Sequence, residues 1–289
     1  MEQDFDESPQ PGKPTLHLQK QVQRALAEDI GAGDLTSVLI PETRHCEATI
    51  LVREEAVICG QPWVNEVFRQ LDERVMVQWT VAEGATIQTN QVVARLSGPA
   101  RALLTGERVS LNFLQTLSGV ATQTQRFVQA VTGTQAVIVD TRKTIPGLRL
   151  AEKYAVRIGG GTNHRMGLYD AILIKENHIA ATGSITNAIH LARTYDGNCQ
   201  FIQVEVETLA QLEEALAAGV GMVMLDNMSV EQQREAVACV AGRSLVEVSG
   251  GVSLEGVRAI AELGVDRISV GSLTKDIRAI DYSMRFKDV

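Results

Sequence analysis

The sequence predicts an α/β protein whose larger part is an α/β barrel. Six short apolar runs recur after residue 135, and each closes on a polar residue or glycine, as buried parallel strands do. Segments with helical spacing separate the later runs, and repeated strand–helix units imply parallel strands with right-handed crossovers. A closed barrel needs eight units, so six suggest an incomplete barrel, with an open doubly wound sheet as the alternative. The predicted strands are Ala136–Asp140, Ala171–Lys175, Phe201–Glu205, Met222–Asp226, Leu245–Ser249 and Arg267–Gly271.

Apolar residues at helical spacing define the elements between these strands. Pro146 and Gly147 form a turn after the first strand, and a helix is predicted from Leu148 to Ile158. Further helices are predicted at Thr208–Ala218, Val230–Val240 and Leu254–Leu263.

The residues before the barrel predict a smaller region of mixed helices and strands. Residues 1–14 hold three prolines and a glycine among acidic residues, so we expect a disordered tail. Helical spacing then predicts helices, and runs of apolar residues with partial alternation predict strands. The predicted helices are Leu16–Ile30, Pro62–Leu71 and Arg101–Leu117, and the predicted strands are Glu47–Cys59 and Val75–Val81.

Composition excludes several classes of protein. A chain of 289 residues that is 45% apolar can bury a sizeable core. Its net charge of −8 argues against a nucleic-acid partner. No apolar run reaches transmembrane length and the N-terminus is polar and acidic, so we expect no membrane partner and no signal peptide. The cysteines are scattered, which favours reduced thiols and a cytoplasmic location. They are Cys46, Cys59, Cys199 and Cys239.

One segment, residues 140–178, concentrates positive charge. Its seven basic and four acidic residues give +3, so the rest of this −8 chain carries −11. An acidic protein that gathers cations in one place has a candidate anion site there. Cations just after strands, or beside the Gly159–Thr162 loop, occupy the positions where α/β proteins bind ligands. They are Arg142, Lys143, Arg165 and Lys175. By contrast, Arg149, Lys153 and Arg157 are spaced four residues apart and are expected on a solvated helix face.

The other strand ends carry carboxylates and glycines. Glu205 and Asp226 could hold ribose hydroxyls or a Mg²⁺-bound ligand, or they could cap the following helices. The last two strands end in Ser249–Gly251 and Gly271–Ser272, where barrels often bind phosphate through backbone N–H groups. These features fit an enzyme that joins a small anion to a phosphorylated sugar. A non-catalytic anion-binding scaffold is disfavoured, because the carboxylates would repel a simple anion.

The same residues resemble the quinolinate phosphoribosyltransferase family, also called nicotinate-nucleotide pyrophosphorylase (carboxylating). The resemblance runs from about Ala25 to Phe286 and is specific, because many segments agree in order. These segments are AEDIGAGDLTS, TGERVSLNFLQTLSGVAT, DTRKTIPGLR, GGGTNHRMGLYDAILIKENHI, VEVE, MLDNM, VSGGV and SVGSLT.

The resemblance implies an N-terminal α/β sandwich domain over residues 15–117 and an incomplete α/β barrel of the type II phosphoribosyltransferase kind over 118–272. Residues 273–289 would return to the first domain. The implied reaction joins quinolinate to phosphoribosyl pyrophosphate with Mg²⁺, and it yields nicotinate mononucleotide, pyrophosphate and CO₂ for NAD biosynthesis. The implied assembly is a homodimer or a higher assembly of dimers.

The resemblance also assigns roles to individual residues. Arg142, Arg165 and Lys175 would hold the quinolinate carboxylates, joined by Arg108 from the neighbouring subunit. Lys143 and His164 would lie near the sugar–pyrophosphate, and Thr141 would also bind substrate. Glu205 and Asp226 would face the ribose hydroxyls and the metal, directly or through substrate and water. The phosphate would be held by Ser249, Gly250, Ser269 and Gly271. The implied catalytic residues are Lys143, His164, Glu205 and Asp226.

Two points stay open at this stage. His164 could act as a general acid–base or only orient its neighbours. Many family members have a histidine where this chain has Lys275, and the lysine could supply a similar charge. The alternative functions are nicotinate phosphoribosyltransferase, which takes a monocarboxylate, and a molybdenum-associated paralogue without this activity.

Overall fold

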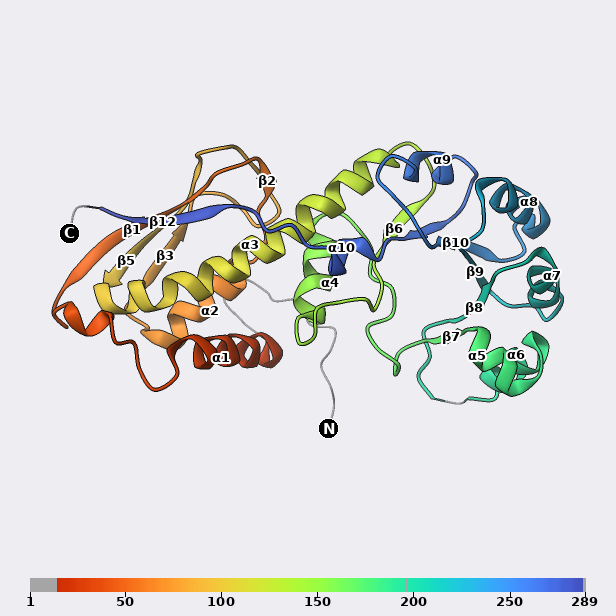
Figure 1. Ribbon diagram of the computed structural model, residues 1–289, viewed down its shortest axis with the longest axis horizontal. Helices are drawn as coiled ribbons and strands as arrows, with labels where there is room; N and C mark the ends of the chain where they lie inside the picture. The colour runs from red at the N-terminus through yellow and green to blue at the C-terminus, as the bar shows by residue number, and fades with distance from the viewer. Residues whose placement is uncertain (1–14, 196, 288–289) are drawn as a thin grey trace. The chain divides into compact units, whose positions relative to one another are not determined.

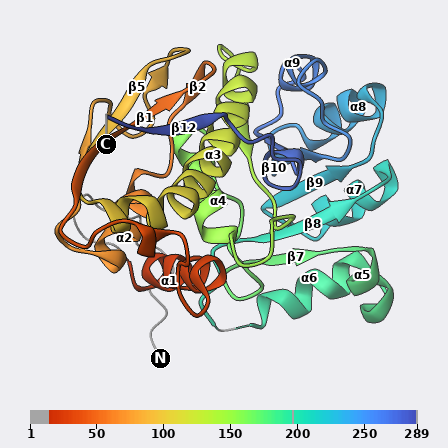
Figure 2. The same ribbon diagram turned by 60° about the vertical axis from the view of Figure 1, so that its left-hand side comes forward.

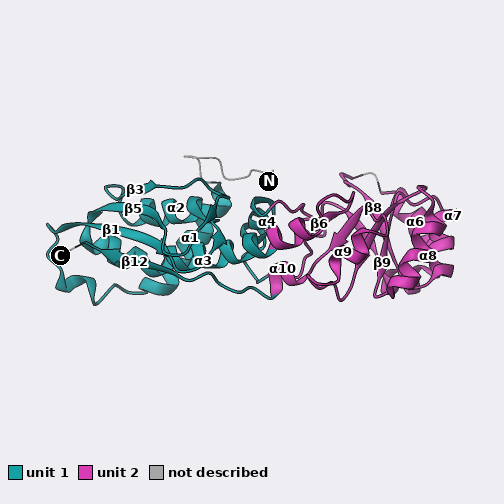
Figure 3. Cartoon of the chain, turned by 90° about the horizontal axis from the view of Figure 1, so that it is seen from above, with its two compact units in different colours: residues 1–123, 145–159, 276–289 teal, residues 124–144, 160–275 magenta. Residues whose placement is uncertain are grey.

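The chain forms two compact units in the computed structural model, which describes residues 15–195 and 197–287 (Figure 1). Unit 1 comprises residues 1–123, 145–159 and 276–289, and unit 2 comprises residues 124–144 and 160–275 (Figure 3). The predicted disordered tail, residues 1–14, lies outside the described residues.

The observed boundaries differ from the predicted ones. The boundary expected after residue 117 falls inside helix α3 (Ala100–Ala130), which passes from unit 1 into unit 2. Helix α4 (Arg149–Ile158), expected in the barrel, belongs to unit 1. The reason is packing, because the Tyr154 ring of α4 lies tilted against the Trp63 ring with 5.3 Å between centroids, and the Tyr154 hydroxyl donates a hydrogen bond to Glu83 at 3.0 Å.

Unit 1 contains a four-stranded antiparallel sheet in the order β12-β1-β5-β3. The last strand of the chain lies at its edge, with Val52 of β1 opposite Tyr282 of β12. The C-terminal segment therefore returns to the sheet of the first domain. The strands are β1 (His45–Val52), β3 (Met76–Trp79), β5 (Val92–Pro99) and β12 (Tyr282–Phe286), and a separate pair joins β2 (Ala56–Val57) to β4 (Thr86–Ile87).

Helices pack with this sheet in unit 1 around an apolar core that includes Ile50, Phe68, Leu96 and Leu114. A Cβ atom on Gly119 of α3 would lie 2.3 Å from the Arg278 carbonyl oxygen, so only glycine allows this close approach. Besides α3 and α4, unit 1 contains α1 (Leu16–Ile30), the 3₁₀ helix η1 (Ser37–Leu39) and α2 (Gln61–Leu71).

The six strands of unit 2 form one parallel sheet in the order β6-β11-β10-β9-β8-β7. From β7 to β11, strands that are consecutive in the sequence are neighbours in the sheet, and the first strand, β6, pairs with the last, β11. This is the strand order of a barrel. Among the described strands, no pairing joins β6 to β7 to close the ring. The incomplete barrel is therefore confirmed, and the doubly wound alternative is wrong. The strands are β6 (Val137–Val139), β7 (Ile172–Ile174), β8 (Ile202–Val206), β9 (Met222–Asp226), β10 (Leu245–Ser249) and β11 (Arg267–Ser269).

Helices cover the outer face of this sheet (Figure 2). Ser184, Thr208 and Ser229 each cap a helix by accepting a backbone N–H, as expected for hydroxyl residues at a helix start. The helix predicted at Leu254–Leu263 is shorter than expected. The helices are α5 (Glu176–Thr182), α6 (Ile185–Arg193), α7 (Leu209–Ala217), α8 (Val230–Val240), α9 (Val257–Ala261) and α10 (Ser272–Lys275).

The strands of unit 2 separate apolar from polar side chains. Val204, Val223 and Val246 are buried on the face that the helices cover. The alternate residues, such as Gln203 and Glu247, are also buried but face the barrel interior, where they contact His164. The interior of the barrel therefore contains buried polar side chains beside apolar ones such as Met224.

One expectation about α4 is wrong. Arg149, Lys153 and Arg157 do not share a solvated face, because Lys153 is fully buried and Arg149 is partly buried. Residues 151–156 are all buried, so α4 is enclosed on most sides. Only Arg157 is exposed as predicted.

Candidate functional site

The C-terminal ends of the parallel strands bring together most of the residues predicted to form the site. Register places Asp226 of β9 opposite Ser249 of β10. Ile174 lies opposite Val204, so the next residues, Lys175 and Glu205, are also neighbours. We call this edge the mouth, comprising Asp140–Lys143, Arg165, Lys175, Glu205, Asp226, Ser249–Gly251 and Gly271.

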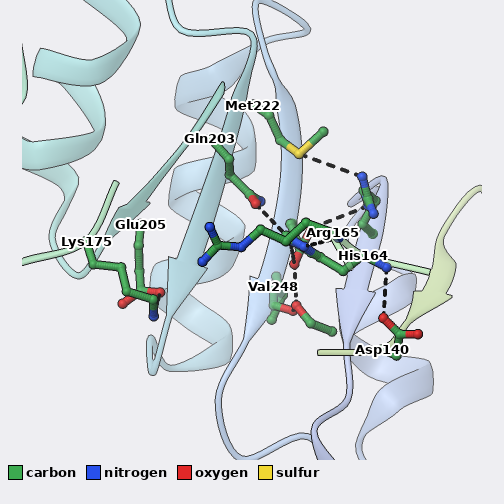
Figure 4. A network of polar contacts seen from close by, with 11 residues as sticks. Asp140, His164, Arg165, Lys175, Gln203, Glu205, Met222 and Val248 are labelled. Atoms are coloured by element: carbon green, nitrogen blue, oxygen red, sulfur yellow. Dashed lines mark hydrogen bonds and ion pairs between the residues drawn. The ribbon is translucent and has the colours of Figure 1, made fainter. Parts of the chain in front are cut away.

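Lys175 and Glu205 form an ion pair across β7 and β8, with 2.6 Å between Nζ and Oε2 (Figure 4). Burial raises the pKa of Glu205, Lys175 opposes that shift, and the negative charge of Asp226 adds to it. The two carboxylates are therefore close enough to interact electrostatically. Together with Lys175 they could hold hydroxyl groups or a bound cation.

Arg165 is a buried cation, only 8% exposed. Burial lowers its pKa, and the nearby positive charge of Arg142 lowers it further. Its Nη1 donates to the Ala171 carbonyl at 3.2 Å, and its side chain extends toward the Lys175–Glu205 pair (Figure 4). Two like charges held close together are unfavourable by themselves, so an anion placed between Arg142 and Arg165 would be bound favourably.

Lys143 and Thr141 lie beside the start of α10. The Lys143 carbonyl accepts the Thr274 hydroxyl at 2.7 Å, and the Lys143 N–H donates to Thr141 Oγ1 at 3.0 Å. A Cβ atom on Gly271 would lie 3.2 Å from Lys143 Cδ, so this lysine covers the glycine. A cation over a glycine-rich strand end is suited to phosphate.

Asn227, which directly follows the mouth residue Asp226, was not predicted from the sequence as part of the site. It adopts a left-handed conformation at φ +54° and donates from Nδ2 to Asp226 Oδ2 at 2.7 Å. Gly250, at φ +93°, has no room for a Cβ atom, which would lie 2.1 Å from Asn227 Oδ1. Asn227 thus orients the Asp226 carboxylate and requires glycine at position 250. Its position directly after Asp226 was the available signal.

His164 lies inside the barrel, and protein groups engage both of its ring nitrogens. Nδ1 accepts the Arg165 backbone N–H at 2.8 Å, and Nε2 lies 2.9 Å from Gln203 Oε1 (Figure 4). Its own backbone N–H donates to Asp140 Oδ1 at 2.8 Å. The ring is therefore the Nε2–H tautomer, and this arrangement favours orienting Arg165 over acid–base chemistry.

Two residues predicted to hold phosphate differ in exposure. Ser249 is partly exposed at the end of β10, as expected for a ligand contact. Ser269 is only 3% exposed, and its hydroxyl donates to the Glu247 carboxylate inside the barrel. Only the backbone of Ser269 is left for a phosphate.

Arg108 and Lys275 lie apart from this cluster in the chain. Arg108 is exposed on α3 and belongs to unit 1, whereas the mouth residues belong to unit 2. Lys275 is exposed at the last position of α10. Within residues 15–195 and 197–287, no group of three or more His, Cys, Asp or Glu side chains could hold a metal ion by itself.

Comparison with known proteins gives matches along most of the chain. The model of the quinolinate phosphoribosyl transferase C-terminal domain matches residues 120–285, and the model of the N-terminal domain matches residues 34–118. A Bacillus subtilis protein named probable nicotinate-nucleotide pyrophosphorylase (carboxylating) is 46% identical over 269 residues, 93% of each chain. A Synechocystis protein of the same name is 40% identical, covering 94% of this chain and 93% of its own. The Francisella tularensis nicotinate-nucleotide pyrophosphorylase structure superposes with a TM-score of 0.91 at 44% identity, covering 97% of this chain and all of that one.

Proposed function

The chain belongs to the quinolinate phosphoribosyltransferase family, and we propose that its mouth transfers the phosphoribosyl group of phosphoribosyl pyrophosphate to quinolinate. The reaction releases CO₂ and pyrophosphate and forms nicotinate mononucleotide for NAD biosynthesis. The observation that carries this proposal is the cation cluster, in which Arg142 lies close enough to lower the pKa of buried Arg165. A dicarboxylate offers two negative charges to such a cluster, and the planar guanidinium groups match carboxylate geometry.

The residues of the mouth fit the chemistry. The pyridine nitrogen of quinolinate attacks C1 of the sugar while the pyrophosphate leaves. The resulting pyridinium stabilises the carbanion that forms when the adjacent carboxylate departs as CO₂, and a proton taken up from water at that ring carbon gives nicotinate mononucleotide. Arg142, Arg165 and Lys175 hold the acid in place, and Glu205 and Asp226 accept the ribose hydroxyls. Holding both reactants in this geometry supplies much of the rate enhancement.

The residues present also fit Mg²⁺, which would neutralise the leaving pyrophosphate. Mg²⁺ in such sites usually takes one or two carboxylates and completes its shell with waters and substrate phosphates. Glu205 and Asp226 form such a pair, because the charge of Asp226 contributes to the raised pKa of Glu205. Asn227 orients the Asp226 carboxylate through the 2.7 Å hydrogen bond.

We extend the proposal to a homodimer, or an assembly of dimers, in which Arg108 enters the mouth of the partner subunit. Support comes from apolar side chains close to Arg108. Leu35, Val38 and Leu39 are at least 61% exposed. Their loop is held on α3 by a hydrogen bond from Thr105 to Asp34 at 2.7 Å, one helical turn before Arg108. Exposed apolar residues gathered in one region are typical of a protein–protein interface.

We also propose a cytoplasmic location without a membrane partner. All four cysteines are free thiols, as expected in a reducing compartment. Among the described helices, none is both long and apolar enough to cross a membrane.

The test of the function compares quinolinate with nicotinate, each supplied with phosphoribosyl pyrophosphate and Mg²⁺. Nicotinate would leave part of the cation cluster buried and unpaired, and sites built to pair a polar group reject analogues that lack it by ~10⁴-fold or more. We expect quinolinate turnover with one CO₂ released per nucleotide, little turnover of nicotinate, and no reaction in EDTA. Comparable rates on both acids would instead support nicotinate phosphoribosyltransferase, and no turnover of either would support the paralogue without this activity.

A further inference from the structure

Glu247 is a buried carboxylate in the barrel interior, below the mouth. It belongs to β10 and is 0% exposed. Its register partners are Met224 on β9 and Arg267 on β11. A buried ion pair usually contributes little to stability, because desolvation offsets the attraction between the charges. Stability alone therefore gives little reason for a charge at this position.

The contacts of Glu247 join two parts of the site. Oε1 accepts the Ser269 hydroxyl and lies 3.5 Å from Nε2 of His164. Oε2 lies 3.3 Å from Nε of Arg267. His164 in turn accepts the backbone N–H of Arg165. Ser269 is two residues before Gly271 at the end of β11. Glu247 thus contacts both the segment with the buried guanidinium and the strand that leads to the glycine loop.

We propose that Glu247 is a positioning residue, which aligns the dicarboxylate held by Arg165 with the phosphorylated sugar held beyond Ser269. This inference rests on the proposed function. The two substrates must meet with the attacking nitrogen in line with C1, and a misplacement of ~1 Å can cost ~10²-fold in rate. Glu247 touches neither substrate and acts through His164 and Ser269.

Arg267 provides the means to separate this role from a structural one. It occupies the first position of β11, at the opposite end of the strand from the mouth. Its guanidinium lies 5.8 Å from the Phe201 ring centroid, and Nη1 lies 3.8 Å from the Met222 sulfur. A methionine side chain fits these apolar surroundings, so Arg267→Met removes the charge with little loss of packing.

The experiment compares Glu247→Gln, Arg267→Met and the double variant, with Glu235→Gln on the exposed surface of α8 as the matched control. Each single interior variant leaves one buried charge unpaired, so both should lower the Tm. The double variant leaves none, so its Tm should return toward that of the wild type. Misalignment should lower kcat about 10–100-fold in E247Q with KM changed little, and this loss should persist in the double variant. The control should match the wild type.

Two results would overturn the proposal. One is an E247Q variant with the kcat of the wild type. The other is a double variant whose kcat recovers together with its Tm, because that outcome assigns Glu247 a structural role only. A wild-type chain without quinolinate turnover would refute the proposed function instead. In that case ¹⁵N NMR of the His164 ring, assigned by comparison with His164→Asn, decides whether Glu247 positions that ring. E247Q and the double variant should both shift those signals, and unshifted signals would reject the role.

Discussion

Unit 1 and the barrel of unit 2 both bury side chains within an α/β framework, yet the main core of unit 1 is apolar, whereas the barrel interior combines polar with apolar side chains. The core of unit 1 is formed by apolar residues such as Ile50, Leu96 and Leu114. The interior of the barrel holds Gln203 and Glu247, both 0% exposed. In the barrel, apolar residues such as Val204 and Val246 lie on the other face of the same strands, under the helices, while Met224 shares the inner face with Glu247.

This difference means that the residues that stabilise the fold and the residues that lead to the site lie in different places. Apolar burial contributes most of the folding free energy, at roughly 25 cal/mol per Å². In unit 1 that burial occurs at the centre of the unit. In unit 2 it occurs on the outer face, so the inner face is free to carry polar groups that lead to the mouth. Substitutions in the core of unit 1 should therefore lower stability, and substitutions in the barrel interior should lower activity. Arg108 is the expected exception, because it belongs to unit 1 but is proposed to act in the mouth.

The largest expected effect concerns Arg108. Arg108→Ala and Lys175→Ala should each be inactive alone, because each removes a cation of the dicarboxylate site. Mixed under subunit exchange, about half of the dimers are mixed, and in a C₂ dimer with Arg108 supplied in trans each of them holds one intact site. Activity should recover to about a quarter of the wild-type value.

The recovery must be measured alongside the fraction of mixed dimers, for example by native mass spectrometry. Mixing each variant with itself is the control and should give no activity. Proven mixed dimers without activity would place Arg108 in the mouth of its own subunit.

The second prediction tests the role of the apolar core. Ile50 is 0% exposed in β1, so Ile50→Ala should reduce the free energy of unfolding by about 2–5 kcal/mol. Below its melting temperature the variant should keep its kcat/KM, because Ile50 belongs to the core of unit 1 whereas the mouth residues belong to unit 2. Met76→Ala is the control, since Met76 is 71% exposed in the same sheet. A loss of kcat/KM in folded Ile50→Ala would show that the two roles are not separate.

The smallest effect concerns a buried carboxylate in unit 1. Burial raises the pKa of Glu152 to about 7, although its carboxylate accepts the Ile145 N–H and Arg149 opposes the shift. A carboxyl whose pKa is higher in the folded state contributes most stability below its unfolded pKa of ~4.3, and that contribution is lost as pH rises through about 7.

Glu152→Gln should therefore match the wild type at pH 5 and be more stable by about 1–2 kcal/mol at pH 8. Urea unfolding at both pH values measures the difference, with exposed Glu255→Gln as the control. A pH-independent difference between the variant and the wild type would exclude Glu152 as the titrating group.

Local pattern was enough to predict most elements of the barrel. Met222–Asp226, Leu245–Ser249 and Val230–Val240 were predicted with the bounds that the structure has. Repeated strand–helix units also led to parallel strands, and the residues at strand ends met at one edge for that reason. Physically, apolar runs and capping residues are local signals, and parallel topology places all strand ends on one side.

Other features depended on contacts between distant segments. The full length of α3 could not be predicted, because Gly119 is a poor helix former and its role, to allow the close approach of the Arg278 carbonyl, involves a distant segment. The burial of Lys153 was missed because helical spacing does not reveal what encloses α4. The pairing of His164 with Gln203 and the link from Glu247 to Ser269 join residues 22 to 39 positions apart.

The sequence by itself thus determined the fold class, the family and the types of residue at the mouth. Only the tertiary structure decided which of them face one another, which are buried, and that the Ser269 hydroxyl belongs to the interior. The physical reason is that secondary structure follows from near neighbours in the chain, whereas hydrogen bonds, ion pairs and burial of side chains depend on residues that only folding brings together.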